Sequence, residues 1–407
     1  MKHIGIIAEY NPFHNGHAYQ LNKAKELFPD KKIVVLMSGN YVQRGEPAIY
    51  SKYIRTQCAL QEYADIVFEL PLLFSCASAE HFASACLQAF HKLGTIDTLC
   101  FGAETDDITL LKEIAHICAV EPDSYKTSLQ EALKEGLSFP KARMLAISTY
   151  MKTQDIESLL KQPNNILAIE YLKALERYHF DITPVIIKRI GNDYHDNDTN
   201  SIYSSATAIR NQIMNGTQSI AHTIPKSSSS IIEQTAFAKP LYISDFYTNL
   251  QYALWKDNAQ LEQFFDVSSD LANQLRAIKQ YPRSYNELLE ILASKQYTTT
   301  RLQRILLNIL LGISSTEMEY FKENNYITYL RLLGAKKDAT SILKDIKEQA
   351  TIPIINKVAN AKTLLSSTSY SYYQQELHRN HLYAQIFYNK YGIHVPSEYE
   401  HSVIICD

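Results

Sequence analysis

Two histidines near the start of the chain are the residues whose types and spacing could do chemistry. His14 and His17 enclose Asn15 and Gly16 in an HxGH pattern that follows residues 4–13 (IGIIAEYNPF), an apolar run and a turn. Such a run predicts a buried parallel strand, and open α/β folds bind ligands at the carboxyl ends of their strands. Gly16 lets the backbone approach a phosphate, which the imidazoles and the N–H groups of a following helix can bind. The pattern predicts a nucleotide site at which the α-phosphate of a nucleoside triphosphate is attacked; the alternative is a turn with two surface histidines.

A second phosphate-binding pattern lies at residues 203–210 (YSSATAIR). Hydroxyl groups and free N–H groups at a helix start bind phosphate, and Arg210, one turn further on, could reach the β- or γ-phosphate. The alternative is ordinary capping of the helix by Ser204 or Ser205 with a solvated arginine. Because an HxGH pattern precedes it, we favour the phosphate-binding interpretation.

The elements that must position these residues alternate between strands and helices. Runs typical of strands occupy residues 4–8, 32–37, 66–70, 98–101 and 182–187, with helical patterns between them and purely helical sequence at about 124–176. Strands separated by helices predict βαβ units and a parallel sheet. We therefore expect an α/β fold, a doubly wound parallel sheet interrupted by a helical insertion.

The sequence also predicts a division into two domains. Residues 225–230 (PKSSSS) are the best linker candidate, since serines next to proline favour irregular, exposed backbone. Residues 1–224 would form the nucleotide-binding domain. Beyond the linker, apolar residues recur at helical spacing, so residues 231–407 are expected to form a mainly α-helical domain.

Composition restricts the classes of function. The chain has 407 residues and a formal net charge of −3, which is typical of a globular protein and predicts no overall basic field for nucleic acid. The six cysteines have irregular spacings that indicate reduced core residues. Neither a hydrophobic signal core nor an apolar run of about 18 residues occurs, so we expect a cytoplasmic protein with no membrane association.

Several longer segments resemble one family. They are residues 7–20 (IAEYNPFHNGHAYQ), 38–48 (SGNYVQRGEPA), 65–71 (DIVFELP), 101–104 (FGAE), 163–172 (PNNILAIEYL) and 188–196 (KRIGNDYHD). Together they resemble the bacterial tRNA(Met) cytidine acetate ligases, which are within the Rossmann-like HxGH nucleotidyltransferase superfamily. The resemblance implies an enzyme that activates acetate with ATP to acetyl-adenylate and then acetylates N4 of the wobble cytidine of elongator tRNA(Met). Ser51 and Tyr63 depart from the family pattern, where Asp and Gly are expected.

The resemblance also implies the residues of the site. His14 and His17 would be catalytic. The ATP-binding residues would be Ile7, Ala8, Glu9, Tyr10, Asn11, Pro12, Phe13, His14, Asn15, Gly16, His17, Ala18, Tyr19, Gln20, Gly102, Asn165, Arg189 and Ile190. ATP chemistry makes Mg²⁺ an expected companion, although no protein ligands for it can be identified. A base that would accept the proton of the cytidine amine cannot be identified either.

A local excess of positive charge suggests where tRNA would bind. Arg276, Arg301 and Arg304 lie in a basic helical stretch, and Lys336 and Lys337 form a second candidate patch. The alternative is a set of solvated helix faces. Because these residues lie beyond the expected linker, we predict that they contribute nothing to the nucleotide pocket.

The roles of a few further residues stay open. Arg44 could contact substrate or form a surface ion pair, and Glu104 could serve the site or begin a helix. The segment 194–196 (YHD), which includes His195, could hold a metal or relay a proton, but a polar loop is the favoured interpretation.

Two other functions compete with the ligase. One is a nucleotidyltransferase that acts on a small phosphorylated acceptor, which would leave the long helical part unexplained. The other is a non-catalytic RNA-binding protein that has kept the fold. Class I aminoacyl-tRNA synthetases share an HxGH site, but the sequence has no KMSKS-like element. No protein partner can be identified.

Overall fold

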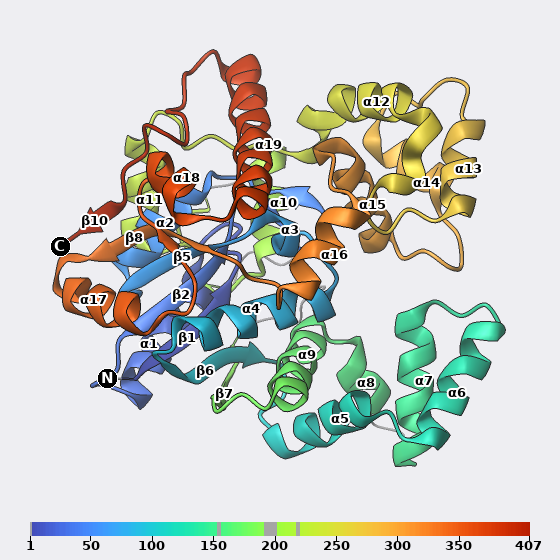
Figure 1. Cartoon of the computed structure of the whole chain (residues 1–407), viewed down its shortest axis with the longest axis horizontal. Coiled ribbons are helices and arrows are strands. Elements are labelled where there is room, and N and C mark those ends of the chain that lie inside the picture. The colour runs from blue at the N-terminus through green and yellow to red at the C-terminus, as the bar shows by residue number, and fades with distance from the viewer. Residues whose placement is uncertain (1, 153–155, 191–201, 217–219) are drawn as a thin grey trace.

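The computed structural model describes residues 2–152, 156–190, 202–216 and 220–407. Five parallel strands form the centre of its main sheet in the order β5-β2-β1-β6-β7 (Figure 1). They are β1 (His3–Ala8), β2 (Ile33–Ser38), β5 (Ile66–Leu70), β6 (Ile96–Ala103) and β7 (Thr183–Lys188). Along the chain the strand order reverses at β1, which has β2 on one side and β6 on the other. The predicted doubly wound sheet is confirmed, and its switch point lies beside the HxGH segment.

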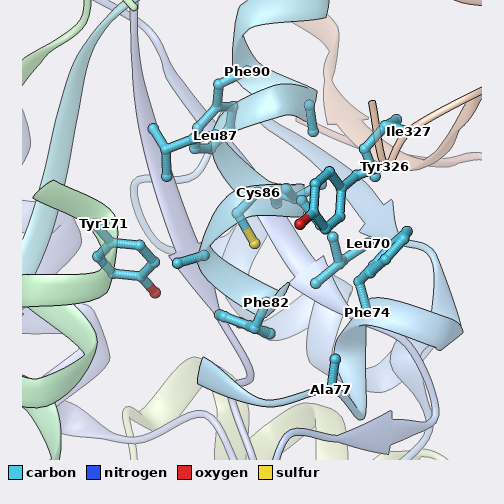
Figure 2. Close-up of a cluster of buried hydrophobic side chains, with 14 of the residues drawn as sticks. Leu70, Phe74, Ala77, Phe82, Cys86, Leu87, Phe90, Tyr171, Tyr326 and Ile327 are labelled. Carbon is cyan, nitrogen blue, oxygen red and sulfur yellow. The ribbon is translucent and has the colours of Figure 1, made fainter. Parts of the chain in front are cut away.

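Helices cover both faces of this sheet, which explains why its strands are mainly apolar. These helices include α1 (Asn15–Leu27), α2 (Lys52–Gln61) and α4 (Ala79–Leu93). Helix α5 (Ile108–Val120) follows β6. Figure 2 shows Phe82, Cys86 and Phe90 of α4 directed into the core, where all three are buried. Gly5 of β1 is required there, because a Cβ atom on it would lie 2.7 Å from the Phe90 ring.

The expected helical insertion is present. It consists of α6 (Asp123–Lys134), α7 (Phe139–Met151), α8 (Ile156–Lys161) and α9 (Pro163–Tyr178), and it ends where β7 completes the parallel sheet. Pro140 and Pro163 lie in the first turns of α7 and α9, where a missing N–H costs no hydrogen bond. Helix α9 packs against α4 and α5, so it joins the insertion to the main body.

The predicted serine linker is a helix instead. Residues 226–230 begin α11 (Lys226–Gln234), which packs against α2. Ser228 is fully buried, and the Ser227 hydroxyl donates to Glu62 at 2.6 Å. These tertiary contacts override the local preference of serine for irregular backbone.

A compact helical unit follows α11. It contains α12 (Tyr247–Lys256), α13 (Ser269–Ala277), α14 (Tyr285–Leu292), α15 (Thr299–Leu311) and α16 (Ser315–Glu323). The first four share a separate apolar core that includes Leu250, Leu271, Leu288 and Ile305. In Figure 1 this unit and the insertion project from the same side of the molecule, with α15 and α16 nearest the sheet.

The last part of the chain corrects the predicted domain boundary. Strand β8 (Leu330–Lys336) pairs antiparallel with β5, and β10 (Ile404–Cys406) and β9 (Ile354–Ile355) pair with β8. Helices α17 (Thr340–Gln349), α18 (Ala361–Leu364) and α19 (Ser367–Tyr391) complete this part. Residues 231–407 are therefore not one helical domain, because their C-terminal strands extend the sheet of the N-terminal half.

Buried charges fasten the C-terminal segment to the sheet. The Lys52 ammonium lies 2.7 Å from Glu69 and 3.0 Å from Glu398, and Arg331 of β8 pairs with Glu398 as well. Although burial opposes ionisation, the two cations lower the pKa of Glu398 to about 2. None of the described helices is both long and apolar enough to cross a membrane.

Candidate active site

The loop after β1 is fixed by contacts from distant segments. The Asn11 side chain accepts a hydrogen bond from the backbone N–H of Ile49 at 2.8 Å. The buried guanidinium of Arg55 donates to the carbonyl groups of Glu9 at 2.5 Å and Ser38 at 3.0 Å. The ends of β1 and β2 therefore hold the HxGH segment in one geometry.

His14 and His17 use their Nδ1 atoms to build the first turn of α1. The backbone N–H of Gly16 donates to His14 Nδ1 at 3.0 Å, and the N–H of His14 donates to His17 Nδ1 at 3.3 Å. The two rings stack with centroids 3.7 Å apart. Because both Nδ1 atoms accept, each neutral ring carries its proton on Nε2 and can donate from there.

Both imidazoles are held in the neutral form. Burial and the nearby charges of Arg189 and Arg210 lower the pKa of His14 to about 3. Burial against Tyr10 and Phe13 and the nearby groups His14 and Arg189 lower the pKa of His17 well below its usual value. A neutral Nε2–H group still donates a hydrogen bond to a phosphoryl oxygen. The pair is thus suited to stabilise developing charge rather than to exchange protons.

A large cavity of about 860 Å³ opens at the carboxyl end of the parallel sheet. Its wall includes several of the predicted ATP-binding residues: Ile7, Ala8, Glu9, His14, His17, Gln20, Gly102 and Arg189. Gly102 lies against Arg189, since a Cβ atom on it would be 3.4 Å from Arg189 Cγ. The absence of a side chain at Gly102 therefore leaves room for the Arg189 side chain to lie along the end of β6.

The second phosphate-binding pattern reaches the same cavity. Ser205 caps α10 (Ala206–Asn215) by accepting from Ala208 N–H at 3.1 Å, and Ser205, Thr207 and Arg210 line the wall. Arg210 donates to the carbonyl of Asn11 at 2.8 Å and to the Thr207 hydroxyl at 3.1 Å. The expected cap by Ser205 is therefore present, and the segment lines the cavity, where phosphate binding stays a prediction.

Other predicted residues shape the site without lining the cavity. Asn165 accepts from the backbone N–H groups of Glu104 and Thr105 at 2.9 and 3.2 Å, and Glu104 in turn accepts from Asn164 and Asn165 at the start of α9. Glu104 thus acts as a carboxylate at the start of a helix, α9, as one interpretation held. Ile190 is exposed and outside the wall. The remaining predicted residues of the loop and of α1 do not line the cavity either: they are Tyr10, Asn11, Pro12, Phe13, Asn15, Gly16, Ala18 and Tyr19.

The helical unit contributes to the cavity, which corrects the expectation that its basic residues stand apart. Arg301 and Arg304 of α15 line the wall together with Asp266, and Arg44 and Arg143 do so from other segments. The sequence hid this arrangement because α15 is more than 280 residues from the HxGH segment. Only the packing of the two halves brings these cations together.

The five predicted tRNA-binding residues do not form one surface. Arg276 is paired with Glu262 at 2.5 Å, and Arg301 with Asp266 at 2.7 Å. Lys336 donates to the carbonyl of Glu62 at 2.5 Å and Lys337 pairs with Asp407, both beside β8 at the opposite side of the molecule from α13 (Figure 1). Glu262 and Asp266, the partners of the two arginines, precede the basic stretch that begins at Arg276, so the sequence pattern did not reveal these ion pairs.

A metal centre made by the protein alone is not found among the described residues, since no group of three or more potential ligand side chains occurs there. His195 and the rest of segment 194–196 lie outside the described residues.

The sheet topology, the HxGH turn and the cavity define a nucleotidyltransferase-type site. In agreement, the family model described as HIGH Nucleotidyl Transferase matches residues 1–395. Two proteins named tRNA(Met) cytidine acetate ligase are similar to this chain over most of both lengths. The one from Acetivibrio thermocellus is 40% identical over 369 residues (88% of this chain, 89% of that protein), and the one from Thermoanaerobacter sp. is 38% identical over 390 residues (95% and 96%). The chain belongs to the tRNA(Met) cytidine acetate ligase family.

Solved structures agree with this assignment. Apo Thermotoga maritima TmcAL superimposes with a TM-score of 0.92 at 28% identity, covering 100% of this chain and 99% of that one. The same protein bound to alpha-thio ATP superimposes with a TM-score of 0.89 over the same shares.

Proposed function

We propose that this chain is an ATP-dependent ligase that activates acetate as acetyl-adenylate and acetylates N4 of the wobble cytidine of elongator tRNA(Met). The observation that carries the proposal is the pair of neutral, stacked histidines facing one cavity with the N-terminus of α10. The names of the relatives and the alpha-thio ATP bound to one of them support the substrates.

In the first half-reaction an oxygen of acetate attacks the α-phosphorus of ATP. A C–O–P bond forms, and the bond to pyrophosphate breaks with its electron pair leaving on pyrophosphate. Acetate is already ionised at neutral pH, so this step needs alignment and charge stabilisation but no base. The Nε2–H groups of His14 and His17 and the guanidinium groups of Arg189 and Arg210 are positioned to supply that charge stabilisation.

In the second half-reaction the cytidine N4 amine attacks the acetyl carbonyl. A C–N bond forms, AMP leaves with the electrons of the C–O bond, and one amine proton is released. The cavity wall supports this step, since residues of the insertion and of the helical unit both line it and a tRNA loop would reach the adenylate between them. Arg276, Arg301, Arg304, Lys336 and Lys337 remain candidates for tRNA phosphate contacts.

Mg²⁺ would enter with the triphosphate, whose oxygens are ligands that this ion prefers. Among the described residues no cluster of potential ligand side chains occurs, so the triphosphate itself would supply most of the ligands of the ion. An enzyme with these substrates would work in the cytoplasm.

The test is incubation of the purified chain with ATP, labelled acetate and tRNA(Met), followed by digestion and nucleoside analysis. We expect label in N4-acetylcytidine only when ATP is present. Binding of tRNA without any acetylation would favour a non-catalytic RNA-binding protein instead.

A further inference from the structure

The cavity wall draws on strand ends on both sides of β1 in the sheet. On the β6 and β7 side lie Gly102 and Arg189. The HxGH turn follows β1 itself, and the start of α10 lies beside it because Arg210 donates to Asn11. On the β2 and β5 side lie the residues that follow those strands, 43–44 and 76–82, together with the start of α15. The features suited to ATP gather at the ends of β1, β6 and β7, so the wall beyond β2 and β5 is available to another substrate.

Arg304 is the notable cation of this second side. Its guanidinium lines the cavity but forms no hydrogen bond or ion pair with any residue in the described ranges. Its carboxylate neighbour Asp266 already accepts two hydrogen bonds from Arg301, at 3.0 and 2.7 Å. Arg304 is half-buried, and this burial lowers its pKa. A partly buried cation that no described residue pairs with is costly unless an anionic ligand completes it.

The position of Arg304 is fixed by a tight contact between α15 and the hairpin β3 (Tyr41–Val42) and β4 (Glu46–Pro47). Gly45, with a φ of 80°, fits so closely that a Cβ atom on it would be 2.4 Å from the backbone nitrogen of Arg304. Gln303 donates to Glu46 at 3.0 Å across the same contact. These contacts hold α15 against the segment that follows β2, and they keep the Arg304 side chain at the cavity wall.

The residues that line this side suit a small monoanion. Small residues of the segment after β5, Cys76, Ala77 and Ala79, line the wall there, which leaves room for a methyl group against apolar atoms. The carboxylate of Glu9 would repel an anion, but Arg44, Arg210 and Arg55 surround it and its Oε1 accepts from the Gln43 N–H at 2.8 Å.

We infer that the β2–β5 side of the cavity is the subsite for the small carboxylate substrate, and that Arg304 binds its oxygens. The inference rests on the proposed function and adds a residue to it: the helical unit supplies a substrate ligand for adenylation. The carboxylate would then lie across the end of β1 from the α-phosphate that it attacks.

The experiment compares Arg304→Gln with Arg283→Gln, which changes an exposed arginine of the same helical unit outside the cavity. Acetate-dependent exchange of labelled pyrophosphate into ATP, without tRNA, gives the acetate KM, and equilibrium dialysis without acetate gives the ATP Kd. For Arg304→Gln we expect the acetate KM to rise about tenfold or more, as the loss of one charged hydrogen-bonding partner predicts. The ATP Kd should stay within about twofold, and Arg304→Lys should recover part of the loss. Arg283→Gln should match the wild type in both quantities.

Other results for Arg304→Gln would overturn the inference. If its ATP affinity falls as much as its acetate affinity, Arg304 is a phosphate ligand. If tRNA binding weakens while the acetate KM stays unchanged, Arg304 is a tRNA contact. Because Arg304 bonds to no residue within the described ranges, Arg304→Gln should unfold at the wild-type temperature or above. A lower melting temperature, with Arg304→Lys equally inactive, would indicate a structural role instead. If the wild type shows no acetate-dependent exchange, both the proposed function and the subsite are rejected. If Arg304→Gln shows exchange with the wild-type acetate KM, only the subsite is rejected.

Discussion

At the scale of single residues, the site depends on two imidazoles whose pKa values are lowered so that both rings are neutral at neutral pH. His14 and His17 accept backbone N–H groups of their own turn at Nδ1, which leaves their Nε2–H groups to donate. Preorganised donors of this kind need no rearrangement when charge develops on a phosphoryl group, which is the usual source of a large rate effect.

Replacing either histidine by alanine should therefore stop adenylation while the fold survives. We expect His14→Ala and His17→Ala each to lower the rate of acetate-dependent pyrophosphate exchange by about 10²- to 10³-fold. His378→Ala, which changes an exposed histidine of α19, is the matched control and should act as the wild type. Near wild-type exchange in a folded His17→Ala variant would reject the assignment of the HxGH turn.

The depressed pKa values give a second test. In the folded protein the imidazole of His14 stays neutral until about pH 3, whereas in the unfolded chain it takes up a proton near its ordinary value of 6.5. The unfolded state then binds more protons, so His14 lowers stability progressively as the pH falls from about 6.5 to about 3, and its effect is constant above that window. NMR titration of the ring carbons should show His14 unchanged from pH 8 to pH 5 in the folded protein and titrating in denaturant. A folded-state midpoint near 6.5 would contradict the buried geometry.

The sequence predicted the cavity residues that short local motifs indicate, and it missed those that only tertiary packing brings to the cavity. The histidine pair and Arg210 sit in short segments whose spacing alone indicates phosphate binding, and both segments reach the cavity. Asn165 was expected at the nucleotide but instead caps the loop after β6. Arg304 was assigned to tRNA because its entry into the cavity depends on contacts with Gly45, which no local pattern records.

At the scale of elements, the contact between the β3–β4 hairpin and α15 determines how the cavity closes. Gly45→Ala would add a Cβ atom only 2.4 Å from the α15 backbone, in addition to the left-handed conformation at φ 80°. Gly136→Ala is a matched control, because Gly136 has a φ of 83° and nothing within 4 Å of the same atom. We expect the control to lose about 1–2 kcal/mol of stability from backbone strain and Gly45→Ala to lose a further ~1–3 kcal/mol from overpacking, measured by urea unfolding. Equal losses would mean that the hairpin contact contributes nothing.

Elements were predictable where burial imposes a simple pattern. The central parallel strands β1, β2 and β5 are buried over most of their lengths, so each is a mainly apolar run that the sequence displays. Strand β8 is interrupted by Arg331 and Gly334, and its partner β10 has three residues, so neither gives such a signal. Gly334 is nonetheless fixed by packing, since a Cβ atom on it would lie 2.7 Å from Leu60.

At the scale of the whole molecule, the C-terminal segment completes a sheet begun by the first strand. Lys52, Glu69, Arg331 and Glu398 form one buried network between α2, β5, β8 and the tail. Removing one member leaves the others charged without compensation, which is expensive in a region closed to water. The fragment 1–224 therefore should not fold alone, because it would lack β8 against β5 and leave the Lys52–Glu69 pair exposed; a cooperative thermal transition of this fragment would contradict that view.

Glu398→Gln tests the network directly. We expect it to lower the free energy of unfolding by about 3–5 kcal/mol, whereas Glu400→Gln, two residues along the same tail and fully exposed, should change it little. The pKa of Glu398 is about 2 in the folded protein against an ordinary 4.5, so its contribution is complete above about pH 4.5 and is lost as the pH falls toward 2. Denaturation at several pH values should show this loss in the wild type and not in Glu398→Gln. If the free energy of unfolding falls equally in the two proteins as the pH is lowered, the buried network does not stabilise the fold in the way proposed.

The most direct measurement of the central claim is exchange of labelled pyrophosphate into ATP by the full-length chain without tRNA. Our account predicts exchange that requires acetate, saturates with it and disappears in the His14→Ala, His17→Ala double variant, because the label can return to ATP only through reversal of acetyl-adenylate formation. Exchange that is independent of acetate, or that requires a small phosphorylated acceptor in its place, would contradict the account.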